Sequence, residues 1–330
     1  MKYTYLGRTG LKVSQLVLGT MNFGPRTDEA ESFAIMDAAL EAGIQFFDTA
    51  NVYGGWDGEG HHGWTEEIMG RWFAQGGGRR EKVVLATKVY NVMQDPYLGP
   101  NEGLGLSAYK IRRHLEDSLR RLQTDHIELY QMHHIDEVPG WDELYGVFEN
   151  VVAAGKVVYV GSSNFGARHI VAAQAAADKR HFLGLVSEQH KLSLTCRLPE
   201  LEVLPACADL GLGVIAWSPL GGGVLSGKAF DPAAGRRTQD EFARLTPTVQ
   251  EQVKRYYAAC AELGESPANV ALAWTLSRPA VTGPIIGPRT VAQLEDTLRA
   301  VEINLEPDFL ALLDDIFPGP GGASPWAYAW

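Results

Sequence analysis

The sequence predicts an α/β fold, a (β/α)8 TIM barrel with an N-terminal β-hairpin and extended loops at the C-terminal face. Eight short apolar segments alternate with segments of helical periodicity, which is typical of a parallel sheet, and eight strands close such a barrel. Polar residues follow most of these segments, and the C-terminal ends of barrel strands share one face, where active sites lie. We expect a single domain over residues 1–330, with a tail at 320–330.

The individual elements follow from turn signals, caps and periodicity. A hairpin signal at 7–10 joins two short segments at 3–6 and 11–13. The barrel strands are predicted at 16–20, 45–49, 83–87, 126–132, 157–162, 185–188, 213–217 and 283–286. The helices are predicted at 28–43, from Thr65 as N-cap, and at 107–122, 141–154, 167–177, 199–210, 247–263, 267–277, 290–300 and 307–316. The loops 55–63, 90–105 and 220–246 and the tail account for the length beyond the roughly 250 residues of an ordinary barrel.

An open doubly wound sheet is the alternative fold. It would bind a dinucleotide through a glycine-rich fingerprint in its first strand–helix turn, and Gly19-Thr20-Met21 does not match that fingerprint. The closed barrel therefore explains the sequence better.

Composition limits the classes of partner. The net charge of −11 argues against nucleic acid and anionic membranes as partners. The three cysteines are odd in number, match no zinc spacing and indicate a reducing compartment. The N-terminus lacks an apolar signal region, and no apolar run reaches membrane-spanning length. We expect a cytoplasmic protein that acts on a small molecule, and leave a homo-oligomer open.

Four polar side chains at successive strand ends form the candidate catalytic group. Asp48 ends one strand, Tyr53 follows it, and Lys88 and His133 close the next two strands. A free phenol has a pKa of about 10, so it needs a nearby cation to act as an acid near neutral pH. Taken singly, Asp48 could cap a turn, Lys88 could reach solvent and Tyr53 could be core. Charges at the ends of buried strands must find partners, so we expect Asp48 to hold Lys88 beside Tyr53, and His133 to orient a carbonyl.

Two further stretches suit phosphate groups. The glycine-rich loop 220–228 ends on Lys228, and its backbone amides could cradle a pyrophosphate. It nearly matches an NTPase phosphate loop, but Ala229 stands where Mg²⁺ needs a hydroxyl. Arg289 precedes a predicted capping box, Thr290 to Gln293, and a helix N-terminus beside an arginine favours a dianion. A loop without ligand and an ordinary cap are the structural alternatives.

Taken together and in this order, the motifs resemble the aldo-keto reductase superfamily. The carrying motifs are Phe47-Asp48-Thr49-Ala50 with Tyr53-Gly54, Ala86-Thr87-Lys88, Leu129-Tyr130-Gln131-Met132-His133, Gly161-Ser162-Ser163-Asn164-Phe165, Trp217-Ser218-Pro219-Leu220 and Gly287-Pro288-Arg289. The resemblance runs over about residues 3–315. Glu188-Gln189 and the tryptophan motif look most like the branch of potassium-channel β-subunits and their bacterial relatives. His133 stands where some of that branch carries asparagine.

The resemblance implies a barrel that reduces aldehydes or ketones with NADP(H). It assigns Asp48, Tyr53, Lys88 and His133 to catalysis, with Tyr53 as proton donor. It places nicotinamide against Trp217, its carboxamide on Ser163, Asn164 and Gln189, and the 2′-phosphate on Arg289, so that NADPH is preferred. The full predicted cofactor set is Thr20, Met21, Asp48, Ser163, Asn164, Gln189, Trp217, Ser218, Pro219, Leu220, Gly222, Lys228, Gly287, Arg289, Gln293 and Asp296.

Two alternatives stay open beside this interpretation, and a third is disfavoured. A cofactor-sensing regulatory subunit would bind NADP(H) and turn over slowly. A lyase or isomerase barrel would use no nicotinamide. A metal site built on His61, His62, His133 and His134 lacks carboxylate or cysteine ligands at ligand spacing, so we expect no metal.

Overall fold

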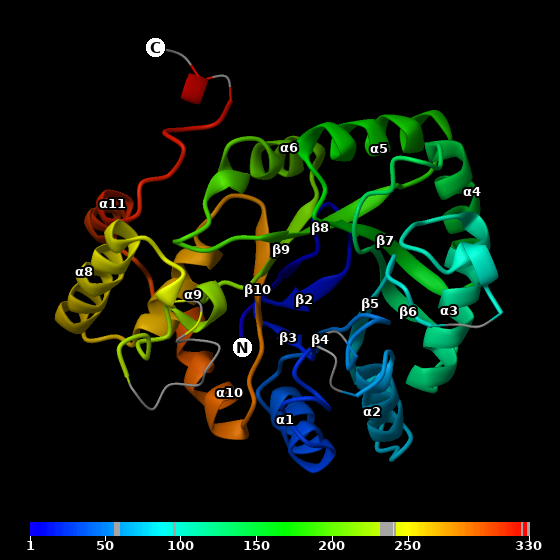
Figure 1. Ribbon diagram of the computed structural model, residues 1–330, viewed down its shortest axis with the longest axis horizontal. Helices are drawn as coiled ribbons and strands as arrows, with labels where there is room; N and C mark the ends of the chain where they lie inside the picture. The colour runs from blue at the N-terminus through cyan, green and yellow to red at the C-terminus, as the bar shows by residue number, and fades with distance from the viewer. Residues whose placement is uncertain (56–59, 95–96, 232–239, 241, 325, 329–330) are drawn as a thin grey trace.

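The computed structural model describes residues 1–55, 60–94, 97–231, 240, 242–324 and 326–328. Its eight parallel strands close into a barrel in the order β10-β3-β4-β5-β6-β7-β8-β9, ringed by helices (Figure 1). The strands are β3 (Val17–Gly19), β4 (Phe46–Asp48), β5 (Val84–Val89), β6 (Ile127–Met132), β7 (Val157–Ser163), β8 (Leu185–Lys191), β9 (Gly213–Trp217) and β10 (Val281–Ile286). The predicted TIM barrel is confirmed.

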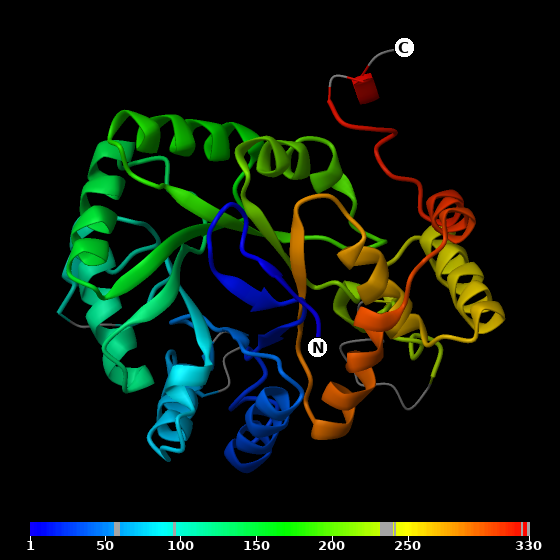
Figure 2. The same cartoon turned by 180° about the vertical axis from the view of Figure 1, so that it is seen from behind.

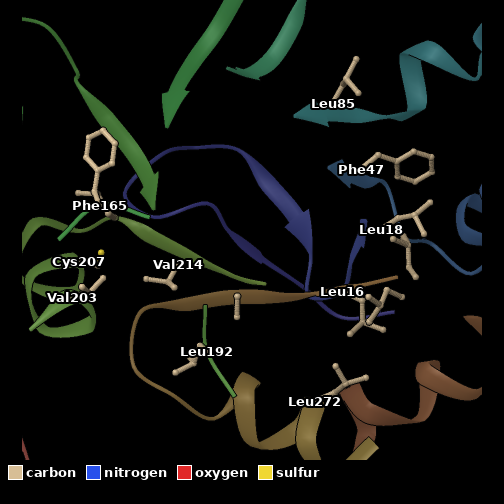
Figure 3. Close-up of a cluster of buried hydrophobic side chains, with 14 of the residues drawn as sticks. Leu16, Leu18, Phe47, Leu85, Phe165, Leu192, Val203, Cys207, Val214 and Leu272 are labelled. Carbon is tan, nitrogen blue, oxygen red and sulfur yellow. The ribbon is translucent and has the colours of Figure 1, made fainter. Parts of the chain in front are cut away.

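The helices cover the outside of the barrel. They are α1 (Glu29–Glu41), α2 (Trp64–Phe73), α3 (Ala108–Leu122), α4 (Trp141–Ala153), α5 (Ala167–Lys179), α6 (Val203–Leu210), α8 (Pro247–Leu263), α9 (Pro267–Leu276), α10 (Val291–Thr297) and α11 (Pro307–Ile316). Strand side chains alternate between two cores. Phe47 belongs to the outer core under the helices, with Leu18 and Leu85 (Figure 3), whereas Phe46 belongs to a smaller core inside the barrel.

The predicted hairpin is confirmed and lies across one end of the barrel (Figure 2). Strands β1 (Tyr3–Tyr5) and β2 (Lys12–Ser14) pair antiparallel. Leu6 and Val13 are fully buried in the inner core with strand residues. Gly7 has φ +54°, and a Cβ there would lie 2.6 Å from the Gly211 carbonyl oxygen, so glycine is needed for the hairpin to sit this close. The closed N-terminal end leaves the opposite face for chemistry.

Several predicted boundaries need correction. Thr65 is not the N-cap of α2: Gly63, in the left-handed region at φ 87°, occupies that place, and the buried Thr65 hydroxyl donates to the Phe23 carbonyl at 2.9 Å. The predicted helix 199–210 is a 3-10 turn, Leu198–Glu200, followed by α6. The predicted helix 290–300 likewise divides into α10 and a 3-10 segment, Leu298–Glu302.

The extended loops and the tail lie partly outside the described residues. This applies to 56–59, 95–96, 232–239, 241, 325 and 329–330. Beyond α11 the chain leaves the barrel (Figure 1), and the Ser324 amide donates to the Leu201 carbonyl at 2.8 Å. Within the described part of the chain, no helix is long and apolar enough to cross a membrane.

Candidate active site

A buried ion pair stands at the centre of the C-terminal face. Lys88, on β5, donates to Asp48 Oδ2 at 2.6 Å, to the Thr49 carbonyl at 2.8 Å and to the Tyr53 hydroxyl at 3.3 Å. The side chains of Lys88 and Asp48 are 0% and 3% exposed. The ammonium group therefore spends its three donors on one carboxylate, one carbonyl and one phenol. The sequence predicted this convergence, and the geometry brings these three residues together.

Two glutamines complete the shell around Asp48. Gln131, on β6, and Gln189, on β8, donate to Asp48 Oδ1 at 3.0 and 2.7 Å. Gln189 also lies 3.3 Å from Gln131 Oε1. Gln131 was not among the predicted site residues. Its position in the Leu129–His133 motif, two residues before His133 and therefore on the same strand face, is the signal that could have found it.

The environment of Tyr53 keeps the phenol protonated. Burial raises its pKa, the Lys88 charge lowers it in part, and the Asp48 charge raises it again, so the net shift is upward from the ordinary value. Burial lowers the Lys88 pKa, but Asp48 and Tyr53 outweigh this effect and raise it overall. Lys88 is thus a permanent cation beside a neutral phenol. It moderates the Tyr53 pKa, as expected, but does not bring it below the ordinary value.

His133 lies beside Tyr53 as a neutral imidazole. Burial, with smaller contributions from Lys88 and His134, lowers its pKa well below the ordinary range. The Asn91 side-chain amide donates to His133 Nδ1 at 3.0 Å, which leaves the ring proton on Nε2. The Tyr53 and His133 rings meet edge to face, with centroids 6.1 Å apart. Asn91 was missed because it lies in a loop beyond β5, where no periodicity marks it.

The His134 ring packs against two other rings near the site. Its ring stacks on His133 at 5.2 Å and contacts Tyr90, also at 5.2 Å between centroids. His61 pairs instead with Glu67 at 3.0 Å. Among the described residues no cluster of three histidine, cysteine or acidic side chains could hold a metal ion.

Asn164 links three strand ends. Its amide nitrogen donates to the His133 carbonyl at 3.1 Å and to Ser163 Oγ at 3.0 Å, and its oxygen accepts from the Trp217 indole at 3.1 Å. It has φ 60°, a left-handed conformation that asparagine tolerates. The half-buried Trp217 ring thus lies with Ser163, Asn164 and Gln189 at the ends of neighbouring strands, and these four residues are the ones predicted to hold the nicotinamide.

A buried glutamate holds this turn from outside the barrel. Glu188 accepts from the Phe165 backbone amide at 2.9 Å, from the Ser162 hydroxyl and from His190. Burial raises its pKa, while these donors, His190 first, lower it only in part. Glu188 therefore fixes the conformation of the turn that carries Asn164, which gives a physical reason for the Glu188-Gln189 pair.

Thr20 and Gly287 lie on the side of the barrel that joins the first and last strands. The Thr20 amide and hydroxyl donate to the Asp48 carbonyl at 3.1 and 3.0 Å. The Asn22 side chain donates to the Gly287 carbonyl at 2.9 Å. Met21 is half-buried next to them. This side of the barrel thus ties the Asp48 backbone to β3.

We call Gly222, Lys228, Arg289, Gln293 and Asp296 the outer rim. Lys228, Arg289, Gln293 and Asp296 are exposed, and Gly222 is half-buried at φ 70°. In the loop after β9, which runs through Ser218, Pro219 and Leu220, the amides of Gly221, Gly223, Leu225 and Ser226 donate to backbone carbonyls of the loop, and those of Gly227 and Ala229 donate to the Tyr257 hydroxyl. Most of the expected phosphate-binding amides are therefore already used to shape the loop.

The Glu31 carboxylate lies at the start of α10. The Thr290 hydroxyl accepts from the Gln293 amide at 3.2 Å, as the capping box requires, but Gln293 Oε1 accepts from the Arg289 amide instead of the Thr290 amide. Glu31, on α1, accepts from the Val291 amide at 2.9 Å. A phosphate at this helix end would share it with the Glu31 carboxylate, a neighbour that no sequence pattern indicates.

One surface hollow, of about 1020 Å³, lies away from this centre. It is lined by residues that precede and flank the N-terminal ends of strands, and its charges pair with each other or with neighbours, as in Arg80–Glu128, Lys156–Glu116 and His126–Asp125. These charged groups already bind each other, whereas the strand ends around Lys88 bring the predicted catalytic residues together.

A family model described as the aldo/keto reductase family matches residues 15–317. The chain belongs to this family. It is 63% identical to an uncharacterized oxidoreductase, YrpG, of Bacillus subtilis (strain 168), over 100% of both chains. It is 34% identical to a probable voltage-gated potassium channel subunit beta of Oryza sativa subsp. japonica, over 92% of both chains. It is 30% identical to a versiconal hemiacetal acetate reductase of Aspergillus parasiticus, over 96% of both chains.

These comparisons confirm the resemblance drawn from the motifs, including its branch with the potassium-channel subunits. Membership in the family supports an oxidoreductase that acts on carbonyl groups. The matched region includes the site residues from Thr20 to Asp296.

Proposed function

We propose that this protein is an NADPH-dependent carbonyl reductase in which Tyr53 protonates the oxygen of an aldehyde or ketone. The observation that carries the proposal is the Lys88 ammonium, which bridges the Asp48 carboxylate and the Tyr53 hydroxyl next to a neutral His133. This is a proton donor with an adjacent fixed cation, and that cation and its carboxylate partner are buried.

Each side chain has a distinct role in this proposal. Tyr53 gives its phenolic proton to the carbonyl oxygen, and the Lys88 cation stabilises the phenolate left behind. Asp48 keeps Lys88 charged and in place. His133, with its proton on Nε2, donates a hydrogen bond to the same carbonyl oxygen. Both donors act on the atom where negative charge develops during reduction.

The bound cofactor would supply the hydride. Ser163, Asn164 and Gln189 would hold its carboxamide, and Trp217 would pack against the nicotinamide ring. Arg289 at the start of α10 would bind a 2′-phosphate, which suits the fixed fork of a guanidinium group. The relative named as a versiconal hemiacetal acetate reductase supports a reductase, and it does not indicate this chain's substrate.

One relative suggests a second function for the same site. A relative is named as a potassium-channel subunit, and a cofactor sensor of that kind would keep NADP(H) bound and react slowly. Rapid turnover on any simple aldehyde supports the reductase and counts against the sensor.

A panel of aldehydes and ketones, assayed by the loss of NADPH absorbance, tests the proposal. We expect steady turnover with at least one carbonyl compound and little with Tyr53→Phe. Tight cofactor binding without turnover on the whole panel would favour the sensor. No binding of either nicotinamide cofactor would overturn both functions and leave a lyase or isomerase barrel.

A further inference from the structure

Asp48 receives more support than an ion pair with Lys88 requires. Its Oδ2 atom pairs with the Lys88 ammonium, while its Oδ1 atom accepts from both Gln131 and Gln189. A buried carboxylate has about four acceptor sites, and each site left without a donor raises the cost of keeping the charge. The two amides thus stabilise the charge and fix which oxygen faces Lys88.

We propose that Gln131 is a positioning residue of this centre, which holds Asp48 in the rotamer that pairs with Lys88. The inference rests on the proposed function, and it adds a residue that acts through Asp48 without touching substrate. Three features support this role. Gln131 is the strand partner of Lys88, Gly161 leaves space for its side chain, and it shares Asp48 Oδ1 as an acceptor with Gln189.

The strand register places Gln131 next to Lys88. The Lys88 and Gln131 backbones are partners between β5 and β6, and Gln131 is the partner of Gly161 on β7. The Gln131 side chain is fully buried. It therefore lies on the inner face of the barrel beside Lys88, within reach of the Asp48 carboxylate across β5.

Gly161 makes room for the Gln131 side chain. A Cβ at Gly161 would lie 3.2 Å from Gln131 Cγ and 2.6 Å from Ser187 Oγ. The second distance is shorter than real side chains allow, so a larger residue at Gly161 would displace this layer of the barrel. The glycine thus leaves space for Ser187 and for Gln131, a long polar side chain of a type that is seldom buried in a core.

Gln131 and Gln189 are not equivalent donors. Family resemblance assigns Gln189 to the cofactor, and its single amide nitrogen now points at Asp48 Oδ1 and Gln131 Oε1. An amide that turned to a cofactor would leave Oδ1 to Gln131 alone. Gln131 lies deeper, fully enclosed, and is the donor that stays with Asp48 in either state.

Two substitutions of Gln131 separate positioning from packing. Gln131→Met keeps the volume and removes the donor, so we expect kcat to fall by about tenfold to a hundredfold, the range for a lost hydrogen bond to a charged group. KM and the Kd of NADPH should stay close to wild type. Gln174→Met is the matched control, because Gln174 is also a buried, hydrogen-bonded glutamine but lies on α5 and donates to Asp178 and Leu183.

Gln131→Glu gives a pH signature that packing alone would not produce. Two carboxyls about 3 Å apart cannot both ionise readily, so they share a proton at low pH, and the protonated acid then donates as the amide did. We expect kcat/KM near the wild-type value at low pH and a loss as the pH rises and the shared proton leaves. A profile for Gln131→Glu that follows wild type, or a kcat for Gln131→Met no lower than for Gln174→Met, overturns the proposal.

Crystal structures of the cofactor-free protein provide a test that does not need activity. In Gln189→Met, we expect Asp48 to remain paired with Lys88, since Gln131 still donates. In the double variant Gln131→Met with Gln189→Met, we expect Asp48 to leave this rotamer. An unchanged Asp48–Lys88 pair in the double variant contradicts the positioning role. If wild type reduces no carbonyl compound but this structural result holds, the proposed function fails and the inference about Gln131 stands.

Discussion

The buried centre around Lys88 and Asp48, where we propose catalysis, and the outer rim use charge in opposite ways. At the centre, Lys88 and Asp48 are buried from solvent and bound by partners from several strands. At the rim, Lys228 and Arg289 are exposed, and the start of α10 is shared with the Glu31 carboxylate. The charges of the centre are bound by other protein groups, whereas the cations of the rim face solvent.

This difference in burial determines whether a substitution lowers folding stability or only ligand affinity. Removing a charge from a buried pair leaves the other charge without compensation, which is strongly unfavourable. Removing a charge from an exposed position loses only its interaction with the ligand, and salt weakens that interaction. We therefore expect changes at the centre to affect the chemical step and changes at the rim to affect cofactor affinity.

Tyr53→Phe should produce the largest effect. The proton donor is lost while the ring and its packing remain, and general acid catalysis contributes about 10²- to 10⁴-fold to a rate. We expect kcat to fall within that range and the Kd of NADPH to stay near the wild-type value. Steady-state turnover and tryptophan quenching measure the two quantities. A kcat close to that of wild type would mean that another group donates the proton.

Lys88→Met should also reduce turnover strongly, and it should shift the pH dependence. The Lys88 charge lowers the Tyr53 pKa, so its loss raises that pKa further and moves the alkaline limb of kcat/KM to higher pH. In wild type the raised pKa of Tyr53 and the lowered pKa of His133 predict a flat profile through neutral pH, with activity lost only as Tyr53 gives up its proton at alkaline pH.

The same variant tests the buried pair. Without Lys88, the Asp48 charge lacks its cation, and breaking such a pair costs about 3–5 kcal/mol of folding stability. Lys88→Met combined with Asp48→Asn removes both charges, so it should restore much of the melting temperature without restoring turnover. An unchanged pH profile in Lys88→Met would contradict the electrostatic role of Lys88.

The sequence carried more information about the centre than about the rim. Asp48, Lys88 and His133 close consecutive buried strands, and parallel strands in a barrel bring such ends together, so their convergence was predictable. The eight strands were predictable for the same reason, because their apolar runs are set by burial on both sides. The misplaced boundaries include that of α2, where Thr65 contacts Phe23, and those of two predicted helices that are partly 3-10 segments.

Side chains that act on other side chains were harder to predict. Gln131 and Asn91 carry no charge, and their roles depend on which neighbour lies within hydrogen-bond distance. At the rim, Glu31 and Val291 are 260 positions apart in the chain, and no local pattern joins them. The glycine-rich loop, Arg289 and the start of α10 therefore indicated groups that attract a phosphate. The Glu31 carboxylate, which would repel a phosphate, was missed.

Arg289→Ala should have a smaller effect than either change at the centre, and it should act on binding. Arginine binds a phosphate dianion through its planar fork, and a hydrogen bond to a charged group contributes on the order of 1.5–3 kcal/mol. We expect NADPH to bind more weakly by this amount and NADH to be little affected. The preference of wild type for NADPH should shrink as salt rises, because Arg289 is exposed. Equal losses for the two cofactors would show that Arg289 supports the fold instead of the phosphate.

Glu31→Gln should have the smallest effect and the opposite sign. The Glu31 carboxylate accepts from the Val291 amide at the start of α10, where it would compete with and repel a 2′-phosphate. Glutamine keeps an oxygen acceptor for that amide but removes the charge. A single charge near an exposed helix terminus is worth about 0.3–1 kcal/mol, so we expect NADPH to bind about two- to fivefold more tightly and NADH to be unaffected.

Glu29→Gln is the matched control, because Glu29 lies on the same helix and pairs with Arg71 at 2.8 Å instead of with α10. Dissociation constants for both cofactors, measured at low and high salt, decide the matter. If Glu31→Gln and Glu29→Gln change the Kd of NADPH equally, net charge alone explains the change. If Glu31→Gln makes NADPH bind more weakly, the Glu31 carboxylate supports the helix start that binds the phosphate.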